Sequence, residues 1–155
     1  MKPLTILAAL GLALAAAPVF GQMPGADAQA LWNHVTQQAP YQQWGQWPDF
    51  AGLQPTHSPH GDLVKVYLNS VTLAAKTTPL PGGALIVKEG YDADQRLLNI
   101  TVMYKLPGFS PAHGDWFWAR YGPQGQAGPS GQPRGCLGCH SAGESNDYVL
   151  SHRYR

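Results

Sequence analysis

Hydrophobic and polar positions follow two different periods along the chain. After the apolar N-terminus, Leu31 and Val35 recur at the spacing of a helical face. Asp27 stands where a helix N-cap is expected, and Pro40 ends the stretch. The pattern therefore predicts a helix over residues 28–38.

Further along, apolar and polar residues alternate, which is the period of a half-buried strand. The connections between these stretches are short, which favours antiparallel pairing. A short helix is expected over 70–76, between the first two strands. The predicted strands cover residues 63–68, 84–89, 98–105 and 115–121.

Two stretches rich in Gly and Pro, 52–61 and 122–135, predict irregular structure. A short helical segment is expected over 41–49. Together the patterns predict an α+β domain, predominantly an antiparallel β-sheet of four or five strands. A helix precedes this sheet, and a segment with both cysteines of the chain follows it.

Residues 1–21 have the layout of a secretory signal peptide, with a positive Lys2, an apolar run over 4–17 and a cleavage site before Gln22. The run of about 14 residues is shorter than the roughly 20 that a spanning helix needs. An uncleaved anchor is the alternative. We expect export to the periplasm and a single domain over 22–155.

Charge adds a second constraint on the partners. The chain has ten Lys and Arg against nine Asp and Glu, and one of the ten, Lys2, lies in the expected signal peptide. A net charge near zero argues against nucleic acid or an anionic membrane surface as the main partner. No later stretch is apolar enough to span a bilayer, so we expect the mature protein to be soluble.

The main chemical motif is Cys136-Leu137-Gly138-Cys139-His140. C-x-x-C-H attaches haem c, because the two thiols are spaced to add to two vinyl groups and the adjacent imidazole can ligate the iron. A redox dithiol would need a βαβ context, and a zinc site would need more ligands than the two cysteines of the chain supply. A disulfide within the motif would be strained. The motif predicts one covalent haem c, with Cys136, Cys139 and His140 as its binding residues and His140 as the metal ligand.

The sixth coordination position has no obvious occupant. No methionine follows His140, whereas small electron carriers usually recruit one downstream. Met103 can ligate in principle, but a place in the core or pocket wall is the simpler interpretation. Five histidines can also ligate in principle, but a place in a loop or on the surface is the simpler interpretation for each: His34, His57, His60, His113 and His152. We expect a five-coordinate iron with an open distal face, which suits small-molecule binding.

Further motifs accompany the late haem segment: Val66-Tyr67-Leu68-Asn69, Pro81-Gly82, Ile86-Val87-Lys88-Glu89, Ile100-Thr101-Val102-Met103-Tyr104-Lys105, Gly114-Asp115-Trp116-Phe117-Trp118 and Asp147-Tyr148-Val149. With them the chain resembles the cytochrome P460 family, which includes the β-sheet cytochromes c′, from about residue 44 to 148. The resemblance implies a homodimer of antiparallel-sheet subunits, each with one five-coordinate haem c.

In that family a strand lysine can bond covalently to the porphyrin, and Lys88 holds the matching position. The alternative is a solvated lysine paired with Glu89 or another carboxylate. Burial beside a haem would lower the pKa of Lys88, because burial disfavours the charged form. We therefore count Lys88 among the cofactor-binding candidates.

The departures from the family concern proton transfer. Members that oxidise hydroxylamine need a distal carboxylate and often carry an arginine on the first strand, where this chain has Met103 and Val64. Neither can take a proton, which favours a neutral ligand such as nitric oxide. Glu89 and Asp115 are fallback bases, and no residue is assigned as catalytic.

Four aromatic residues are expected nearest the haem: Tyr67, Trp116, Phe117 and Trp118. Strand alternation allows either Phe117 or the two tryptophans to face it. Filling the core or a dimer interface is the alternative role for these side chains.

Three functions remain open. The favoured one is a periplasmic haem protein that binds nitric oxide or related small nitrogen oxides. The second is an oxidoreductase acting on hydroxylamine or nitric oxide, which passes electrons through the haem to a redox partner protein. The third is a simple electron-transfer cytochrome.

Overall fold

The computed structural model describes residues 23–154, so the expected signal peptide lies outside the described part of the chain. Within that part, no helix is both long enough and apolar enough to cross a membrane.

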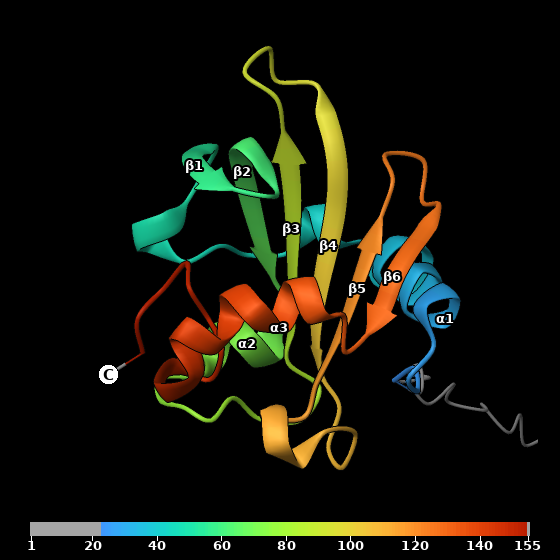
Figure 1. The fold of residues 1–155 in the computed structure, drawn as a ribbon, viewed down its shortest axis with the longest axis vertical. Coiled ribbons are helices and arrows are strands. Elements are labelled where there is room, and N and C mark those ends of the chain that lie inside the picture. Colours follow the sequence, from blue (N-terminus) through green and yellow to red (C-terminus); the bar gives the residue numbers. More distant parts are fainter. Residues whose placement is uncertain (1–22, 155) are drawn as a thin grey trace, which may run out of the picture.

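The centre of the fold is one antiparallel sheet whose strands follow one another in sequence order (Figure 1). This confirms the α+β class and the predominance of antiparallel sheet. The six strands are β1 (Gln54–Ser58), β2 (Gly61–Leu68), β3 (Leu85–Tyr91), β4 (Leu97–Lys105), β5 (Trp116–Tyr121) and β6 (Ala127–Gly131).

Both edge strands were missed by the sequence pattern. β1 and β6 fall in the stretches predicted to be irregular, so the expectation of four or five strands was wrong. Each edge strand contains a proline, Pro55 or Pro129. An edge position tolerates proline, because one side of the strand needs no ladder hydrogen bonds.

The helix predicted over 28–38 is present. It runs as α1 (Ala28–Asn33) and continues as a π-helical turn, η1 (His34–Gln38). The Asp27 side chain accepts a hydrogen bond from the Ala30 amide at 2.6 Å, as expected of an N-cap. The remaining helices are η2 (Tyr41–Gln43), η3 (Pro48–Phe50), α2 (Ser70–Ala74), η4 (Pro111–His113), α3 (Arg134–His140) and η5 (Ser141–Asn146).

The sheet separates two hydrophobic clusters. On one face α1 and η1 pack against strand residues such as Val87, Val102 and Phe117. On the other face lie Ile86, Trp116 and Trp118, with α3 crossing in front of the strands (Figure 1). Strand alternation therefore decides which side chains can meet the C-terminal cysteines.

Candidate functional site

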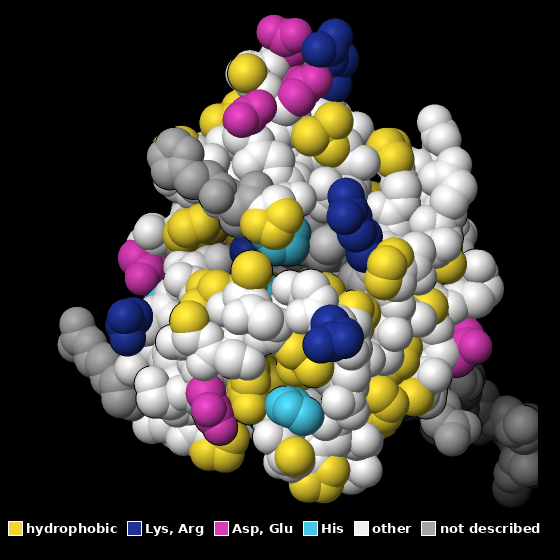
Figure 2. Space-filling view, viewed as in Figure 1, with side chains coloured by type: hydrophobic (Ala, Val, Ile, Leu, Met, Phe, Trp, Pro, Cys, Tyr) yellow, Lys and Arg dark blue, Asp and Glu magenta, His cyan; other side chains and the backbone are white. Residues whose placement is uncertain are grey.

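A cavity of about 440 Å³ opens on the face of the sheet that α3 crosses. Its volume is within the range of roughly 300–1,000 Å³ that is usual for small-molecule and cofactor sites. Figure 2 shows this face, where hydrophobic side chains gather and a histidine is visible among them. The lining includes all the residues predicted from the sequence to bind the cofactor: Cys136, Cys139, His140 and Lys88.

Helix α3 brings the three motif residues together. Pro133 precedes it, and its carbonyl accepts a hydrogen bond from the Cys136 amide at 2.9 Å. Residues three and four apart share one helix face, so Cys136, Cys139 and His140 all reach the cavity. Both thiols are free rather than joined as a disulfide. Among the residues whose side chains the structure describes, no three His, Cys, Asp or Glu are grouped to hold a metal ion.

The imidazole of His140 is oriented by the backbone that follows it. Its Nδ1 lies 2.8 Å from the Tyr148 carbonyl oxygen, which can only accept, so Nδ1 carries the proton and Nε2 the lone pair. Burial lowers the pKa of His140 and favours this neutral form. Asp147 and Tyr148 have φ values of +54° and +65°, and these left-handed residues turn the chain back toward α3.

A buried ion pair fixes that turn to the sheet. Lys105 Nζ, at the end of β4, lies 2.5 and 2.8 Å from the two carboxylate oxygens of Asp147. The same carboxylate accepts hydrogen bonds from the Leu80 amide at 2.7 Å and from Trp116 Nε1 at 3.2 Å. The acceptor of His140 is therefore held by the residue next to it. Sequence reasoning gave neither Lys105 nor Asp147 this role.

Lys88 reaches the cavity because of its place on β3. Ile86 and Lys88 point into the cavity, whereas Val87 and Glu89 point to the other face of the sheet. Burial lowers the pKa of Lys88 to about 8, in the direction expected. The alternative of a Lys88 and Glu89 ion pair was wrong, since adjacent strand residues project oppositely.

Glu89 belongs to a separate cluster behind the sheet. Its carboxylate accepts hydrogen bonds from Tyr41 at 2.7 Å, Tyr67 at 3.0 Å and Tyr91 at 2.6 Å. Placing Tyr67 beside the haem, and Glu89 as a base there, was therefore wrong.

Asp115 and the aromatic residues complete the comparison with the sequence. The Asp115 carboxylate accepts a hydrogen bond from the Ser110 amide at 2.9 Å, and Asp115 is not part of the cavity lining. Phe117 packs against Phe109 on the face opposite the cavity, with ring centres 5.3 Å apart. Trp116 and Trp118 share the cavity face, and Trp118 is the one that lines the cavity.

The sheet wall of the cavity is mainly apolar. Val64 and Met103, the positions matched to an arginine and a carboxylate elsewhere in the resembled family, both line it. No Asp or Glu belongs to its described lining. Buried Trp118 Nε1 has no hydrogen-bond partner among residues 23–154. A bound group with an oxygen acceptor would satisfy it, and haem propionates and nitrogen oxides both carry one.

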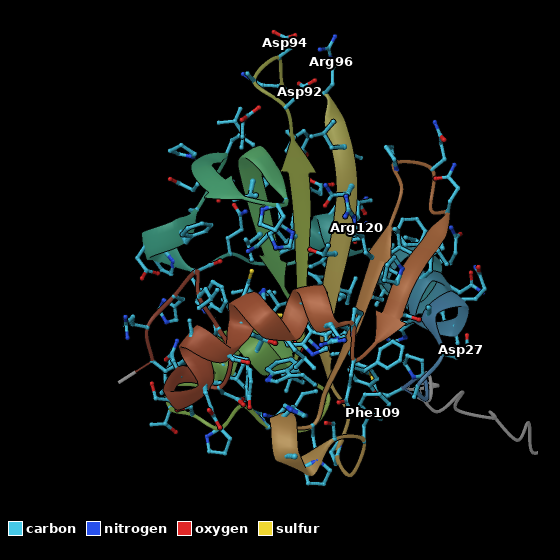
Figure 3. The ribbon with its side chains drawn as sticks, viewed as in Figure 1. Asp27, Asp92, Asp94, Arg96, Phe109 and Arg120 are labelled. Carbon is cyan, nitrogen blue, oxygen red and sulfur yellow. The ribbon has the colours of Figure 1, made fainter. Side chains whose placement is uncertain are left out.

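Two polar residues of the cavity were not assigned from sequence. His60, one of five histidines considered, has its ring centre 6.4 Å from that of His140. Burial, with smaller contributions from the charges of Lys88, His140 and Arg120, lowers the pKa of His60 to about 3. Arg120 lies over the same face of the sheet (Figure 3) and also lines the cavity. Neither residue belongs to a recognisable motif.

Comparison with known families decides the class of the site. The family described as Cytochrome P460 matches residues 39–151. The chain belongs to the cytochrome P460 family. This cytochrome P460 is accordingly a protein with covalently bound haem c. The search of curated proteins gave no match.

The residues of the cavity fit that cofactor. Two free thiols and a neutral imidazole line one wall. Apolar side chains line the opposite wall, and an indole N–H without a partner in the described residues is available to an acceptor. In this cytochrome P460 the cavity thus combines covalent attachment, iron ligation and an apolar ligand space.

Proposed function

We propose that this cytochrome P460 is a periplasmic monohaem protein that binds nitric oxide or a related small nitrogen oxide. Cys136 and Cys139 attach the haem, and His140 ligates its iron. One observation carries the proposal: the cavity that contains the C-x-x-C-H motif has a mainly apolar sheet wall and no carboxylate in its described lining. A neutral diatomic ligand needs no base, whereas hydroxylamine must lose protons.

The attachment chemistry needs only residues of the motif. Each thiol adds across one vinyl group, so that the sulfur bonds to carbon and the thiol hydrogen goes to the neighbouring carbon. No oxidant is consumed. When bound, the haem supplies an iron that takes up nitrogen oxides and exchanges one electron. The hydrogen bond from His140 Nδ1 to the Tyr148 carbonyl fixes the imidazole ring and leaves the Nε2 lone pair available to ligate the iron.

Lys88 supports a further bond to the porphyrin. Its neutral amine, favoured by burial, is the nucleophilic form. Such a bond would join the lysine nitrogen to a porphyrin carbon, with the loss of one hydrogen from each partner. The two electrons released would be taken up by a peroxide, which would be reduced to water. Cross-linking therefore depends on exposure to oxidant.

Oxidation of hydroxylamine or nitric oxide is the second candidate function. It needs a proton acceptor, and the described lining of the cavity has no Asp or Glu, while burial lowers the pKa of His60 and makes its imidazole a weak base. The oxidoreductase would need a redox partner protein to take up its electrons, as would a simple electron carrier. A homodimer is expected from the family resemblance, and light scattering on the purified protein tests it.

Visible absorption spectra of the holoprotein test the proposal. They are recorded ferric and ferrous, with and without mild peroxide, and the ferrous protein is titrated with nitric oxide without oxygen. We expect nitric oxide to bind tightly without turnover. A red-shifted ferrous Soret band after peroxide should disappear in Lys88→Ala.

Lys65→Ala is the matched control, because Lys65 on β2 lies over the Tyr67 ring on the opposite face of the sheet. Its spectra should equal those of the wild type. Turnover of hydroxylamine with an added electron acceptor would contradict the proposal and support the second candidate. Failure to bind nitric oxide would contradict the proposed nitric oxide binding.

A further inference from the structure

The turn formed by Asp147 and Tyr148 supplies the carbonyl oxygen that faces His140 Nδ1. Both residues have positive φ values, +54° and +65°, in a region that disfavours residues with a side chain. Neither is glycine, and such residues keep this conformation only when the surrounding structure holds them. The contacts of the turn should therefore show what holds it.

Three segments of the chain hold Asp147. Lys105 Nζ at the end of β4 lies 2.5 and 2.8 Å from its two carboxylate oxygens, and the Leu80 amide donates to one of them at 2.7 Å. Trp116 Nε1, at the start of β5, donates to the backbone carbonyl of Asp147 at 2.9 Å and to its carboxylate at 3.2 Å. All four side chains are buried. The ion pair and the indole thus fix both the side chain and the backbone of this residue.

These contacts reach the ligand of the iron through one peptide unit. The peptide between Asp147 and Tyr148 is bonded at both of its polar groups. Trp116 donates to its oxygen, and its N–H donates to the Gly143 carbonyl at 2.8 Å. The next carbonyl along the chain, that of Tyr148, accepts from His140 Nδ1 at 2.8 Å. That oxygen cannot move away from the imidazole unless the contacts of this peptide also change.

The hydrogen bond at Nδ1 affects the iron through the imidazole ring. An acceptor at Nδ1 raises the basicity of the other ring nitrogen, which strengthens its bond to a metal. Ferric iron carries the larger positive charge and gains more from a basic ligand than ferrous iron, so the reduction potential falls. Because a hydrogen bond weakens steeply as its geometry is lost, the position of the Tyr148 carbonyl controls this effect.

We propose that Lys105, Asp147 and Trp116 are positioning residues for His140, which strengthen its bond to the iron and lower the reduction potential of the haem. None of the three belongs to the described lining of the cavity, so they act through the Tyr148 carbonyl. The inference rests on the ligation of iron by His140 that the proposed function includes, but not on the identity of the small ligand.

Two measurements on the holoprotein test the proposal. Spectroelectrochemical titration gives the reduction potential, and resonance Raman spectroscopy of the ferrous protein gives the iron–histidine stretching frequency. The main variant combines Lys105→Met with Asp147→Asn, which removes both charges and leaves the net charge unchanged. Asparagine also tolerates the left-handed backbone at this position. We expect a higher potential and a lower stretching frequency than in the wild type.

Trp116→Phe is a second test that leaves the ion pair in place. It removes the N–H donor to the peptide oxygen without any change of charge, so both values should shift in the same directions. Glu89→Gln is the matched control. It also replaces a buried carboxylate by an amide, but its partners are three tyrosines on the opposite face of the sheet. It should destabilise the fold and leave the iron–histidine frequency unchanged.

Two results would overturn the proposal. If the double variant and Trp116→Phe unfold more easily but keep both wild-type values, the ion pair and the indole have a structural role alone. If Lys105→Met and Asp147→Asn shift the potential in opposite directions at an unchanged frequency, their charges act on the iron directly and do not position His140.

Nitric oxide titration separates this inference from the proposed function. Shifted potentials and frequencies in the variants of a protein that does not bind nitric oxide would support the positioning role and contradict the proposed function. Nitric oxide binding by the wild type, with both values unchanged in the double variant and in Trp116→Phe, would do the reverse.

Discussion

The ion pair between Lys105 and Asp147 offers the clearest stability prediction. The side chains are 7% and 5% exposed, and they connect β4 to the turn that presents the acceptor for His140. Lys105 Nζ also lies 4.8 Å from the centre of the Trp116 ring. Asp147→Asn removes the negative charge with little change of shape and leaves a buried ammonium without its counterion.

The expected loss is large. Removing one partner of a buried pair typically lowers the free energy of unfolding by about 3–5 kcal/mol, because the remaining charge stays buried. The hydrogen bonds of the Asp147 carboxylate to the Leu80 amide and Trp116 Nε1 are weakened too, although the asparagine oxygen can keep one of them. We therefore expect about 3–5 kcal/mol for Asp147→Asn.

Urea unfolding of the holoprotein, followed by far-ultraviolet circular dichroism, measures this loss. Lys105→Met and the double variant complete a double-mutant cycle, and the double variant should be more stable than the sum of the single effects predicts. Arg96→Ala is a control for an ion pair in solvent. Arg96 bonds to Asp92 and Asp94 at the tip of the β3–β4 hairpin (Figure 3) and is 73% exposed, so its loss should cost about 1 kcal/mol or less.

Two results would refute this reasoning. A loss below about 1 kcal/mol for Asp147→Asn would mean that the buried charge is not held unpaired in the variant. Additive effects of the two substitutions would mean that Lys105 and Asp147 act independently despite their 2.5 Å separation.

Two further predictions concern the opposite face of the sheet. Burial and the hydrogen bonds to Glu89 raise the pKa of Tyr41, Tyr67 and Tyr91 above the ordinary value near 10. The folded state therefore keeps protons that the unfolded chain loses, so the free energy of unfolding should fall as the pH rises above about 10. Unfolding series at several pH values should show a shallower fall in Glu89→Gln, and an equal slope would contradict the role of the cluster. Asp27→Ala should lower the free energy of unfolding by about 1 kcal/mol through loss of the helix cap, measured by urea unfolding; no change would exclude a capping role.

The alternation of apolar residues was sufficient to predict the four inner strands and the first helix. It failed at β1 and β6, where prolines and glycines carry no period and pairing with a neighbour makes the strand. The same alternation separates Lys88 from Glu89, but the sequence does not state which face the cysteines will cover. Tyr67 was therefore predicted beside the haem, although it lies on the face of the sheet opposite the cavity.

The candidate site could be predicted where its residues are close in sequence. Cys136, Cys139 and His140 share one helix, so their spacing alone predicts a common face. His60 and Asp147 depend on contacts with strands far away in the chain, such as those from Asn99 and Lys105. No local pattern reports such contacts, and so the place of neither residue was found from sequence.

The opposite orientations of Lys88 and Glu89 also affect how β3 finds its partners. A slip of one residue in the pairing of a strand exchanges its two faces. In this strand it would carry a carboxylate into the cavity and an ammonium group into the cluster of tyrosine hydroxyls. A misaligned β3 would thus bury both charged groups without their partners. The central hairpins are therefore held in one register by these two side chains as well as by apolar packing.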